Sequence, residues 1–103
     1  MTQAELYTAL KSLGLPVAYS HFDTAPSIPF LVYYFGSSND FYADNINFAD
    51  GSMFTVELYT AKKDLASEKL VEDKFKELSI AYTKLEEWIE TEKLYQIAYE
   101  IQI

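Results

Sequence analysis

The strongest restriction on the fold of this chain is one apolar stretch. Residues 30–35 read Phe-Leu-Val-Tyr-Tyr-Phe, so six apolar or aromatic residues follow one another without a polar break. Such a run is typical of a β-strand that is covered on both faces and lies centrally in its sheet. Pro26 and Pro29 mark a loop before it, and Gly36 begins a loosely patterned segment after it. The sequence therefore predicts a sheet with this strand in its interior.

Other segments also have the pattern of β-strands. Phe54, Val56 and Leu58 occupy alternate positions, which predicts a strand with one buried face, and Asp50-Gly51 before it is a hairpin turn signal. Short strands are also expected at 17–22, 41–48 and 85–90, of which 41–48 has the weakest pattern. The clearest alternation ends the chain, at Tyr95, Ile97, Tyr99, Ile101 and Ile103.

Two segments have the period of amphipathic helices. Thr2 and Glu5 fit a capping box at the start of the first helix, whose apolar stripe comprises Leu6, Ala9, Leu10 and Leu13. The second helix covers 62–78, and Asp64 or Ser67 can cap its first turn. Its buried stripe comprises Val71, Phe75 and Leu78.

The order of these elements predicts an α+β fold in a single domain, 1–103. One helix, four strands, a second helix and two strands follow one another (α-β-β-β-β-α-β-β). Short connections between neighbouring strands favour a mostly antiparallel sheet with both helices packed on one face. The other face would then keep aromatic side chains from 30–35 and from the last strand, and exposed apolar patches usually mark a partner surface.

The charge balance restricts the function. Sixteen acidic residues stand against eight lysines, the chain has no arginine, and its net charge is −8. Arginine is the usual bidentate ligand of phosphate and guanine, and an acidic protein repels the phosphate backbone. We therefore expect no specific binding of DNA or RNA. A wall that DNA merely passes is a different case, because repulsion keeps the polymer from adhering.

Aromatic residues are unusually frequent, with nine tyrosines, seven phenylalanines and one tryptophan. Tyrosine and tryptophan combine an apolar body with a polar tip, which suits surfaces that become buried against a partner. They can equally fill a core that is too small for many aliphatic residues. The sequence leaves both interpretations open.

Residues that could be catalytic or bind a metal lack the neighbouring groups that such a site needs. His21 is the single histidine, and a surface or strand-end position explains it better than a catalytic or metal-binding role. The chain has no cysteine, and its three glycines cannot form a phosphate-binding motif. No apolar run reaches the length of a membrane helix. We therefore expect no enzyme, no cofactor and no membrane partner.

Two acidic groups could be mistaken for sites: Asp40, Asp44 and Asp50 in one segment, and Glu86, Glu87, Glu90 and Glu92 in another. The first group does not follow the spacing of a calcium-binding loop, and its asparagine and aspartate residues also favour turns. The second group has no predicted enclosure that would separate the pKa values of paired carboxylates. A turn and a solvated strand edge are the simpler interpretations.

Several stretches resemble small proteins encoded in the head–tail gene cluster of siphophages and prophages of Gram-positive bacteria. They are Leu-Pro-Val-Ala-Tyr at 15–19, Ile-Pro-Phe-Leu-Val-Tyr-Tyr at 28–34, Ser-Asn-Asp-Phe-Tyr-Ala-Asp-Asn at 38–45 and Glu-Lys-Leu-Tyr-Gln-Ile-Ala-Tyr-Glu-Ile at 92–101. The resemblance spans nearly the whole chain in its layout and in these local stretches. No chemical motif accompanies it.

The resemblance implies a tail-completion, tail-terminator or head–tail joining protein. Such proteins are α+β subunits of a ring, commonly a hexamer, that caps the tail tube, docks to the head connector and lets DNA pass. Their place is the virion, after assembly in the cytoplasm of the bacterial host. The segment 36–50 is our candidate for an arm that contacts a neighbour or the tube. The candidate assembly interface comprises Asp40, Phe41, Tyr42, Asp44, Asn45, Tyr95 and Tyr99.

Two other functions remain open at this point. A small-ligand binder should have a pocket with convergent polar groups. An acidic mimic of nucleic acid should gather its carboxylates on one face, whereas the acidic residues of this chain are scattered over the helices and strand turns.

Overall fold

The computed structural model describes residues 1–38, 41–43, 46–49 and 52–103. Its elements in chain order are α1 (Gln3–Lys11), β1 (Val17–Tyr19), β2 (Phe30–Ser38), β3 (Phe41–Ala43), β4 (Ile46–Ala49), β5 (Ser52–Thr60), α2 (Leu65–Glu77), β6 (Tyr82–Ile89) and β7 (Leu94–Gln102). Thr2 caps α1 through the predicted capping box with Glu5. Asp64 caps α2 by accepting a hydrogen bond from the backbone N–H of Ser67 at 3.0 Å. Both helices therefore begin at their predicted caps.

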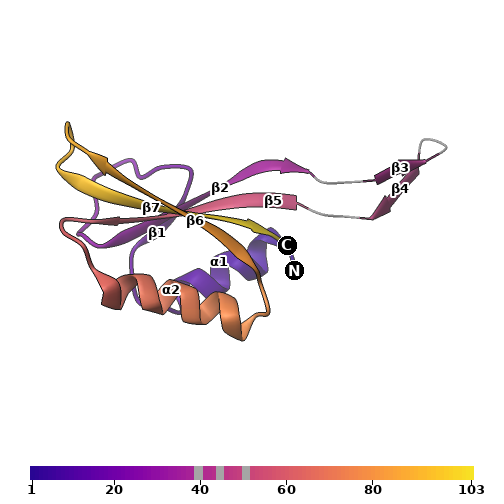
Figure 1. The fold of residues 1–103 in the computed structure, drawn as a ribbon, viewed down its shortest axis with the longest axis horizontal. Coiled ribbons are helices and arrows are strands. Elements are labelled where there is room, and N and C mark those ends of the chain that lie inside the picture. The colour runs from indigo at the N-terminus through magenta and orange to yellow at the C-terminus, as the bar shows by residue number, and fades with distance from the viewer. Residues whose placement is uncertain (39–40, 44–45, 50–51) are drawn as a thin grey trace.

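Five strands form one sheet in the order β1-β2-β5-β7-β6, and β3 pairs with β4 in a separate two-stranded sheet. β1 runs parallel to β2, whereas the β2–β5, β5–β7 and β7–β6 pairs are antiparallel. Figure 1 shows α1 and α2 on the same face of the five-stranded sheet. The predicted α+β fold, with a mostly antiparallel sheet and its helices on one face, is confirmed.

The hydrophobic core lies between this face and the helices. Leu6 and Leu10 of α1, with Val71 and Phe75 of α2, meet side chains from every second strand position: Val17, Leu31, Tyr33, Phe54, Val56, Leu58, Ile97, Tyr99 and Ile101. Burying a large apolar side chain contributes about 1.5–3 kcal/mol. The alternation that predicted strands at 54–59 and 94–103 is therefore the pattern that attaches the sheet to the helices.

Two predicted strands differ from the structure. The strand predicted at 17–22 ends at Tyr19, because Ser20 adopts a φ of 69° and the backbone N–H of His21 donates to the carbonyl of Tyr19 at 2.8 Å. The segment 41–48 forms two strands instead of one, with Ala43 of β3 opposite Ile46 of β4. The turn predicted at Asp50-Gly51 lies outside the described residues.

The apolar stretch 30–35 begins β2, which lies inside the sheet between β1 and β5 as predicted. Its predicted cover on both faces is only partial. Leu31 and Tyr33 are buried on the helix side, whereas on the opposite side Val32 is buried but Phe30 and Tyr34 are only half-buried. The reason is that both described helices pack on the same face, so the opposite face receives no second layer from them.

The molecule is elongated, with extents of 49 × 29 × 24 Å. β2 and β5 pair as far as Ser38 opposite Ser52, and Figure 1 shows β3 and β4 beyond this end, away from the helices. β1 and β6 are the two outer strands of the main sheet. The sheet therefore offers one uncovered face, two lateral edges and one extended end.

Candidate interaction surfaces

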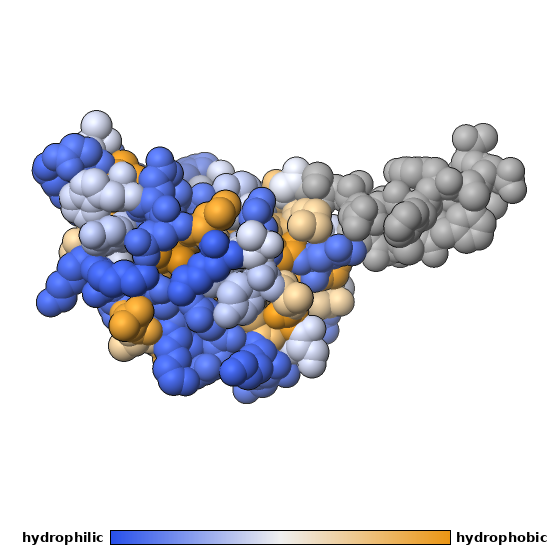
Figure 2. Space-filling view, viewed as in Figure 1, coloured by the Kyte–Doolittle hydropathy of each residue, from blue (hydrophilic) through white to orange (hydrophobic). Residues whose placement is uncertain are grey.

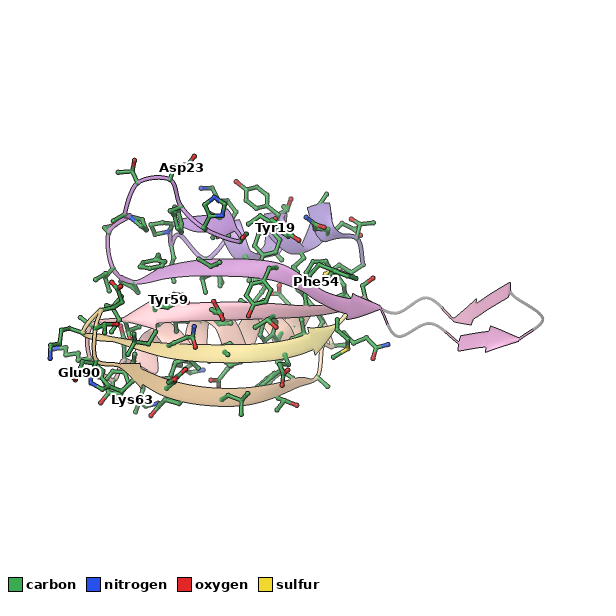
Figure 3. The ribbon with its side chains drawn as sticks, turned by 90° about the horizontal axis from the view of Figure 1, so that it is seen from above. Tyr19, Asp23, Phe54, Tyr59, Lys63 and Glu90 are labelled. Carbon is green, nitrogen blue, oxygen red and sulfur yellow. The ribbon has the colours of Figure 1, made fainter. Side chains whose placement is uncertain are left out.

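We call the sheet face opposite the helices the open face, which Figure 3 views directly. Glu57, Glu87 and Glu100 lie on it. None of the described strand residues of this face is a lysine or an arginine. The face comprises Ala18, Phe30, Val32, Tyr34, Met53, Thr55, Glu57, Tyr59, Thr83, Leu85, Glu87, Ile89, Leu94, Gln96, Ala98, Glu100 and Gln102.

A hydrogen-bonded network holds the aromatic side chains of the open face in place. The Glu57 carboxylate accepts hydrogen bonds from the hydroxyls of Tyr34 at 3.0 Å and Tyr59 at 2.9 Å. The side-chain amide of Gln96 donates to the Tyr59 hydroxyl at 2.7 Å. Phe30 stacks on Tyr59 with ring centroids 4.9 Å apart and planes inclined by 17°. The hydroxyls of these tyrosines therefore have hydrogen-bond partners within the chain, and the surface that they form is not purely apolar.

Burial and the neighbouring carboxylate further favour the protonated form of two tyrosines in the network. Burial raises the pKa of Tyr59 to about 12, and the hydrogen bond and charge of Glu57 act in the same direction. Burial, followed by the bond to Glu57, also raises the pKa of Tyr34. Both hydroxyls therefore stay protonated and can donate hydrogen bonds across the neutral range.

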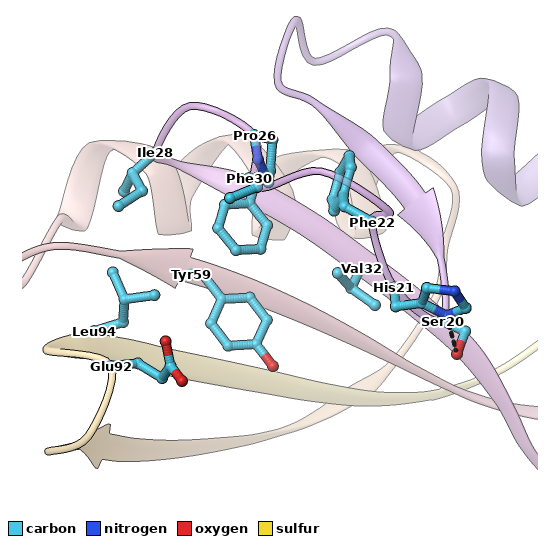
Figure 4. A pocket seen from close by; sticks show the side chains of 11 residues that line it. Ser20, His21, Phe22, Pro26, Ile28, Phe30, Val32, Tyr59, Glu92 and Leu94 are labelled. Atoms are coloured by element: carbon cyan, nitrogen blue, oxygen red, sulfur yellow. Dashed lines mark hydrogen bonds between the residues drawn. The ribbon is translucent and has the colours of Figure 1, made fainter.

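A groove of about 550 Å³ lies at one end of the open face (Figure 4). Phe22 packs edge-on against Phe30 at 5.5 Å, so aromatic rings form much of its wall. His21 lies at its exposed rim, with Nδ1 3.2 Å from the Ser20 hydroxyl, which confirms the prediction of a surface histidine. The groove is lined by Ser20, His21, Phe22, Ala25, Pro26, Ile28, Phe30, Val32, Tyr59, Glu92 and Leu94.

An ion-pair cluster around the buried Glu68 connects α2 to the sheet on the helix side. Glu68 lies 2.8 Å from the Lys63 ammonium and 2.7 Å from that of Lys84, and Lys84 also lies 2.8 Å from Glu72. The Tyr99 hydroxyl donates to Glu72 at 2.7 Å. Burial opposes the ionisation of Glu68, but the hydrogen bonds and charges of Lys63 and Lys84 outweigh it and lower its pKa. Because each acid faces a base, the cluster fits a structural role.

The structure places the predicted interface residues in three different environments. Asp40, Asp44 and Asn45 lie outside the described residues, and Phe41 and Tyr42 belong to β3. Tyr95 lies beside Trp88 on the helix side of the sheet, with ring centroids 4.8 Å apart. Tyr99 is fully buried against Phe75. The prediction that Tyr99 lies in an interface is therefore wrong, because its strand face packs on α2.

No direct signal in the sequence indicated the open-face network. Tyr34, Glu57 and Gln96 come from three strands that are distant in sequence. The alternation in β5 indicated that Glu57 and Tyr59 share one face, but not which residues of other strands lie beside them. Which residues lie side by side could be determined only once the pairing of β2, β5 and β7 was known.

Neither a metal centre nor a membrane span is evident in the described part of the chain. Within it, no group of three or more His, Cys, Asp or Glu residues could hold a metal ion. No helix there is long and apolar enough to cross a membrane. The open face, the groove and the sheet edges are therefore the features that a functional proposal can use.

Comparisons with known proteins assign no family to this chain. No family model matches it, and no curated protein matches it significantly. A functional proposal consequently depends on the resemblance in local sequence and on the surfaces described above.

Proposed function

We propose that this protein is a structural subunit of a phage particle, a tail-terminator or head–tail joining protein that forms a ring through which DNA passes. Its partners would be further copies of itself, the head connector and the tail-tube protein, and its place the virion. The order of elements and the stretches at 15–19, 28–34, 38–45 and 92–101 support this reading. The geometric support for this proposal comes from the open face.

The open face has the charge that a DNA passage requires. It bears Glu57, Glu87 and Glu100 and, among its described strand residues, no base. A surface of this kind repels phosphates, so DNA can slide along it without adhering. The helices would then form the outer wall of the ring, because they lie on the opposite side of the sheet.

Self-assembly tests this proposal. We expect the purified protein, alone or mixed with the tail-tube protein of the same phage, to form a hexameric ring. Multi-angle light scattering over a range of concentrations measures the mass, and negative-stain electron microscopy checks for a central opening. A protein that stays monomeric at every concentration, with and without tube protein, would contradict the proposal.

The groove favours one other function, the binding of a small apolar ligand. Its volume of about 550 Å³ and its aromatic wall are those of a ligand pocket. The polar residues that line it are Ser20, His21, Tyr59 and Glu92. Native mass spectrometry of the same samples separates the two functions, since a ligand binder would appear as a monomer carrying a bound small molecule.

A further inference from the structure

β6 is the longer of the two outer edges of the main sheet. β6 (Tyr82–Ile89) has eight residues, whereas β1 (Val17–Tyr19) at the other edge has three. All residues from 82 to 88 are exposed, and Figure 3 shows β6 as the outermost strand on its side of the sheet. A long exposed edge is a template for pairing with a further strand.

The outer side of β6 has backbone groups that no described strand uses. Within the described residues, β6 pairs with β7 alone, over its whole length and without a register shift. On the side away from β7, the N–H and C=O groups of alternate residues point outward and can bond to another antiparallel strand. Proline and bulges often block such an edge, and β6 has neither. It does carry Lys84, Glu86 and Glu87, so a partner strand has to match these charges.

A second copy of β6 can pair with the first only in certain registers. When a two-fold axis stands perpendicular to the sheet, the two strands run antiparallel and both open faces stay on the same side. Directly opposed residues point to the same face, and side chains alternate between the faces along a strand. One residue therefore faces its own copy at the axis, and residues equally distant from it on either side face one another.

The register in which Leu85 faces its own copy matches the side chains on the helix side of β6, which are those of Tyr82, Lys84, Glu86 and Trp88. Lys84 then lies opposite Glu86 of the second copy, and the same pair recurs on the other side of the axis. Tyr82 and Trp88, which are 39% and 42% exposed, also lie opposite each other. Opposite charges and aromatic pairs are favourable cross-strand neighbours.

The charged side chains on the helix side are already held in place within each chain. Lys84 lies 2.7 Å from Glu68, and Glu86 pairs with Lys63. Side chains that are fixed beforehand lose less conformational entropy on association. In the register centred on Leu85, a base of one copy adjoins an acid of the other, so the two ion-pair clusters extend each other.

The same register suits the open face. Leu85, which is 55% exposed, meets its own copy there, so two exposed apolar side chains cover each other. Glu87 lies opposite Thr83, whose hydroxyl can donate a hydrogen bond to a carboxylate. No acid of β6 therefore lies directly opposite another acid.

Neighbouring registers bring like charges together. If Glu86 or Glu87 faced its own copy, two carboxylates would be opposed at the axis, and if Lys84 did so, two ammonium groups would be. Like charges directly opposite each other destabilise a sheet. Registers centred nearer to either end of β6 pair fewer of its residues. The charges of this edge therefore select a second copy of the same strand in one register.

We propose that two copies of this chain associate through antiparallel β6 strands, with Leu85 facing Leu85, so that their two five-stranded sheets become one continuous sheet. Such an isologous contact closes with two subunits and builds no ring by itself. It therefore goes beyond the proposed function and concerns the protein in the absence of other phage components.

Single thiols test both the contact and its register, because the chain has no cysteine. Leu85→Cys places a thiol opposite its own copy. Thr83→Cys and Glu87→Cys are matched controls on the same face, since each lies about 14 Å along the strand from its own copy. A disulfide requires Cα atoms within about 7 Å of each other. The variants are oxidised with dilute copper phenanthroline at concentrations where light scattering finds wild-type dimers, and non-reducing electrophoresis measures covalent dimers.

We expect Leu85→Cys to give on the order of tenfold more disulfide dimer than Thr83→Cys or Glu87→Cys alone, because only its thiols are held together by the contact. A mixture of Thr83→Cys with Glu87→Cys should give more than either alone, since these positions oppose each other. Efficient dimers from Glu87→Cys alone would mean another register and would overturn the inference. Circular dichroism checks that each variant is folded.

The outcomes separate this contact from the proposed function. Rings that form with tube protein, without selective disulfides in the free protein, would overturn the contact and leave the proposed function intact. A Leu85→Cys disulfide dimer whose wild-type parent never forms rings would do the reverse. A wild type that is monomeric at every concentration, with and without tube protein, would overturn both.

A second measurement uses charge in place of thiols. Leu85→Asp and Leu85→Lys each put a charge opposite a like charge, so we expect each to raise the dimer dissociation constant on the order of tenfold. Their mixture places Asp opposite Lys and should recover dimers, which native mass spectrometry identifies by mass. Leu70→Asp and Leu70→Lys are the controls, because Leu70 is an exposed leucine of α2, and they should dimerise like wild type. A mixture of the Leu85 variants that dimerises no better than either alone would contradict the inference.

Discussion

Glu68 is the residue whose burial most needs explanation. Its side chain is only 2% exposed, and an unpaired carboxylate in such a place would strongly destabilise the fold. Lys63 approaches it from the connection between β5 and α2 and Lys84 approaches it from β6, so the charge is compensated. The same contacts lower the pKa of Glu68 against the opposing effect of burial.

Glu68→Gln should lower the free energy of unfolding at pH 7 by about 2 kcal/mol, somewhat less than a fully buried broken pair, because both lysines reach solvent. The folded-state pKa of Glu68 is lower than its usual 4.5. Its stabilisation is therefore present above pH 4.5 and is lost as the pH falls through the folded-state pKa. Urea unfolding at pH 7 and at pH 3 should show the difference between wild type and variant shrinking on acidification.

Glu77→Gln provides the control for this prediction. Glu77 pairs with Lys74 on the exposed side of α2, so its loss should hardly change stability at either pH. If the Glu68→Gln difference were the same at both pH values, the ionised form of Glu68 would not be the source of the stabilisation.

At the scale of elements, β2 and β5 carry the chain from the body of the sheet to its extended end. Their ladder continues to Ser38 opposite Ser52, past a register shift between Phe35 and Ser37. A two-residue turn is the natural connection between two directly paired antiparallel residues. The segment between these serines can therefore be replaced without altering the ladder.

Replacing residues 39–51 by Asn-Gly should give a folded protein that is as stable as wild type or more stable by up to about 1 kcal/mol, because a shorter loop costs less entropy to close. Urea unfolding measures this change. We also expect the variant to lose its association with tail-tube protein, since 36–50 is the predicted arm. If the variant associated with tail-tube protein as strongly as wild type does, 36–50 would not be the arm. If the variant did not fold, the rest of the chain would need this segment for its stability.

At the scale of the whole molecule, charge is divided between the two faces of the sheet. Among the described lysines, Lys63, Lys84 and Lys93 pair with acids on the helix side or at a turn. The open face keeps its glutamates without a basic strand residue. The net charge of −8 is therefore not spread evenly over the molecule. In an assembly, the direction in which the open face points decides whether passing DNA lies against these glutamates.

The double variant Glu87→Lys/Glu100→Lys tests this direction. We expect it to retain linear double-stranded DNA on the order of tenfold more strongly than wild type at low salt, because lysines that face the polymer release its counterions. Gel-shift titration at two salt concentrations measures the retention and its salt dependence.

Asp73→Lys/Glu77→Lys is the control with the same change in net charge, since both residues lie on exposed positions of α2. It should bind DNA no better than wild type within an assembled ring. If the two double variants bound equally well, net charge alone would explain the binding, and the open face would not line the passage.

Features that depend on near neighbours in the chain could be predicted from the amino-acid sequence. The capping box of Thr2 and Glu5 and the cap at Asp64 lie within one helical turn of the groups they bind. The alternation in 54–59 and 94–103 follows from the two-residue period of a strand. The α+β class followed from the order of these elements, because each must bury its apolar side against another.

Features that depend on residues distant in sequence became evident only in the folded chain. Tyr99 became a core residue because Glu72 and Phe75 of α2 lie beneath it. The open-face network exists because β5 pairs with both β2 and β7, which brings Glu57 to Tyr34 and Tyr59 to Gln96. Strand order and register are set by the packing of the whole chain, and a local pattern contains no information about which strands become neighbours.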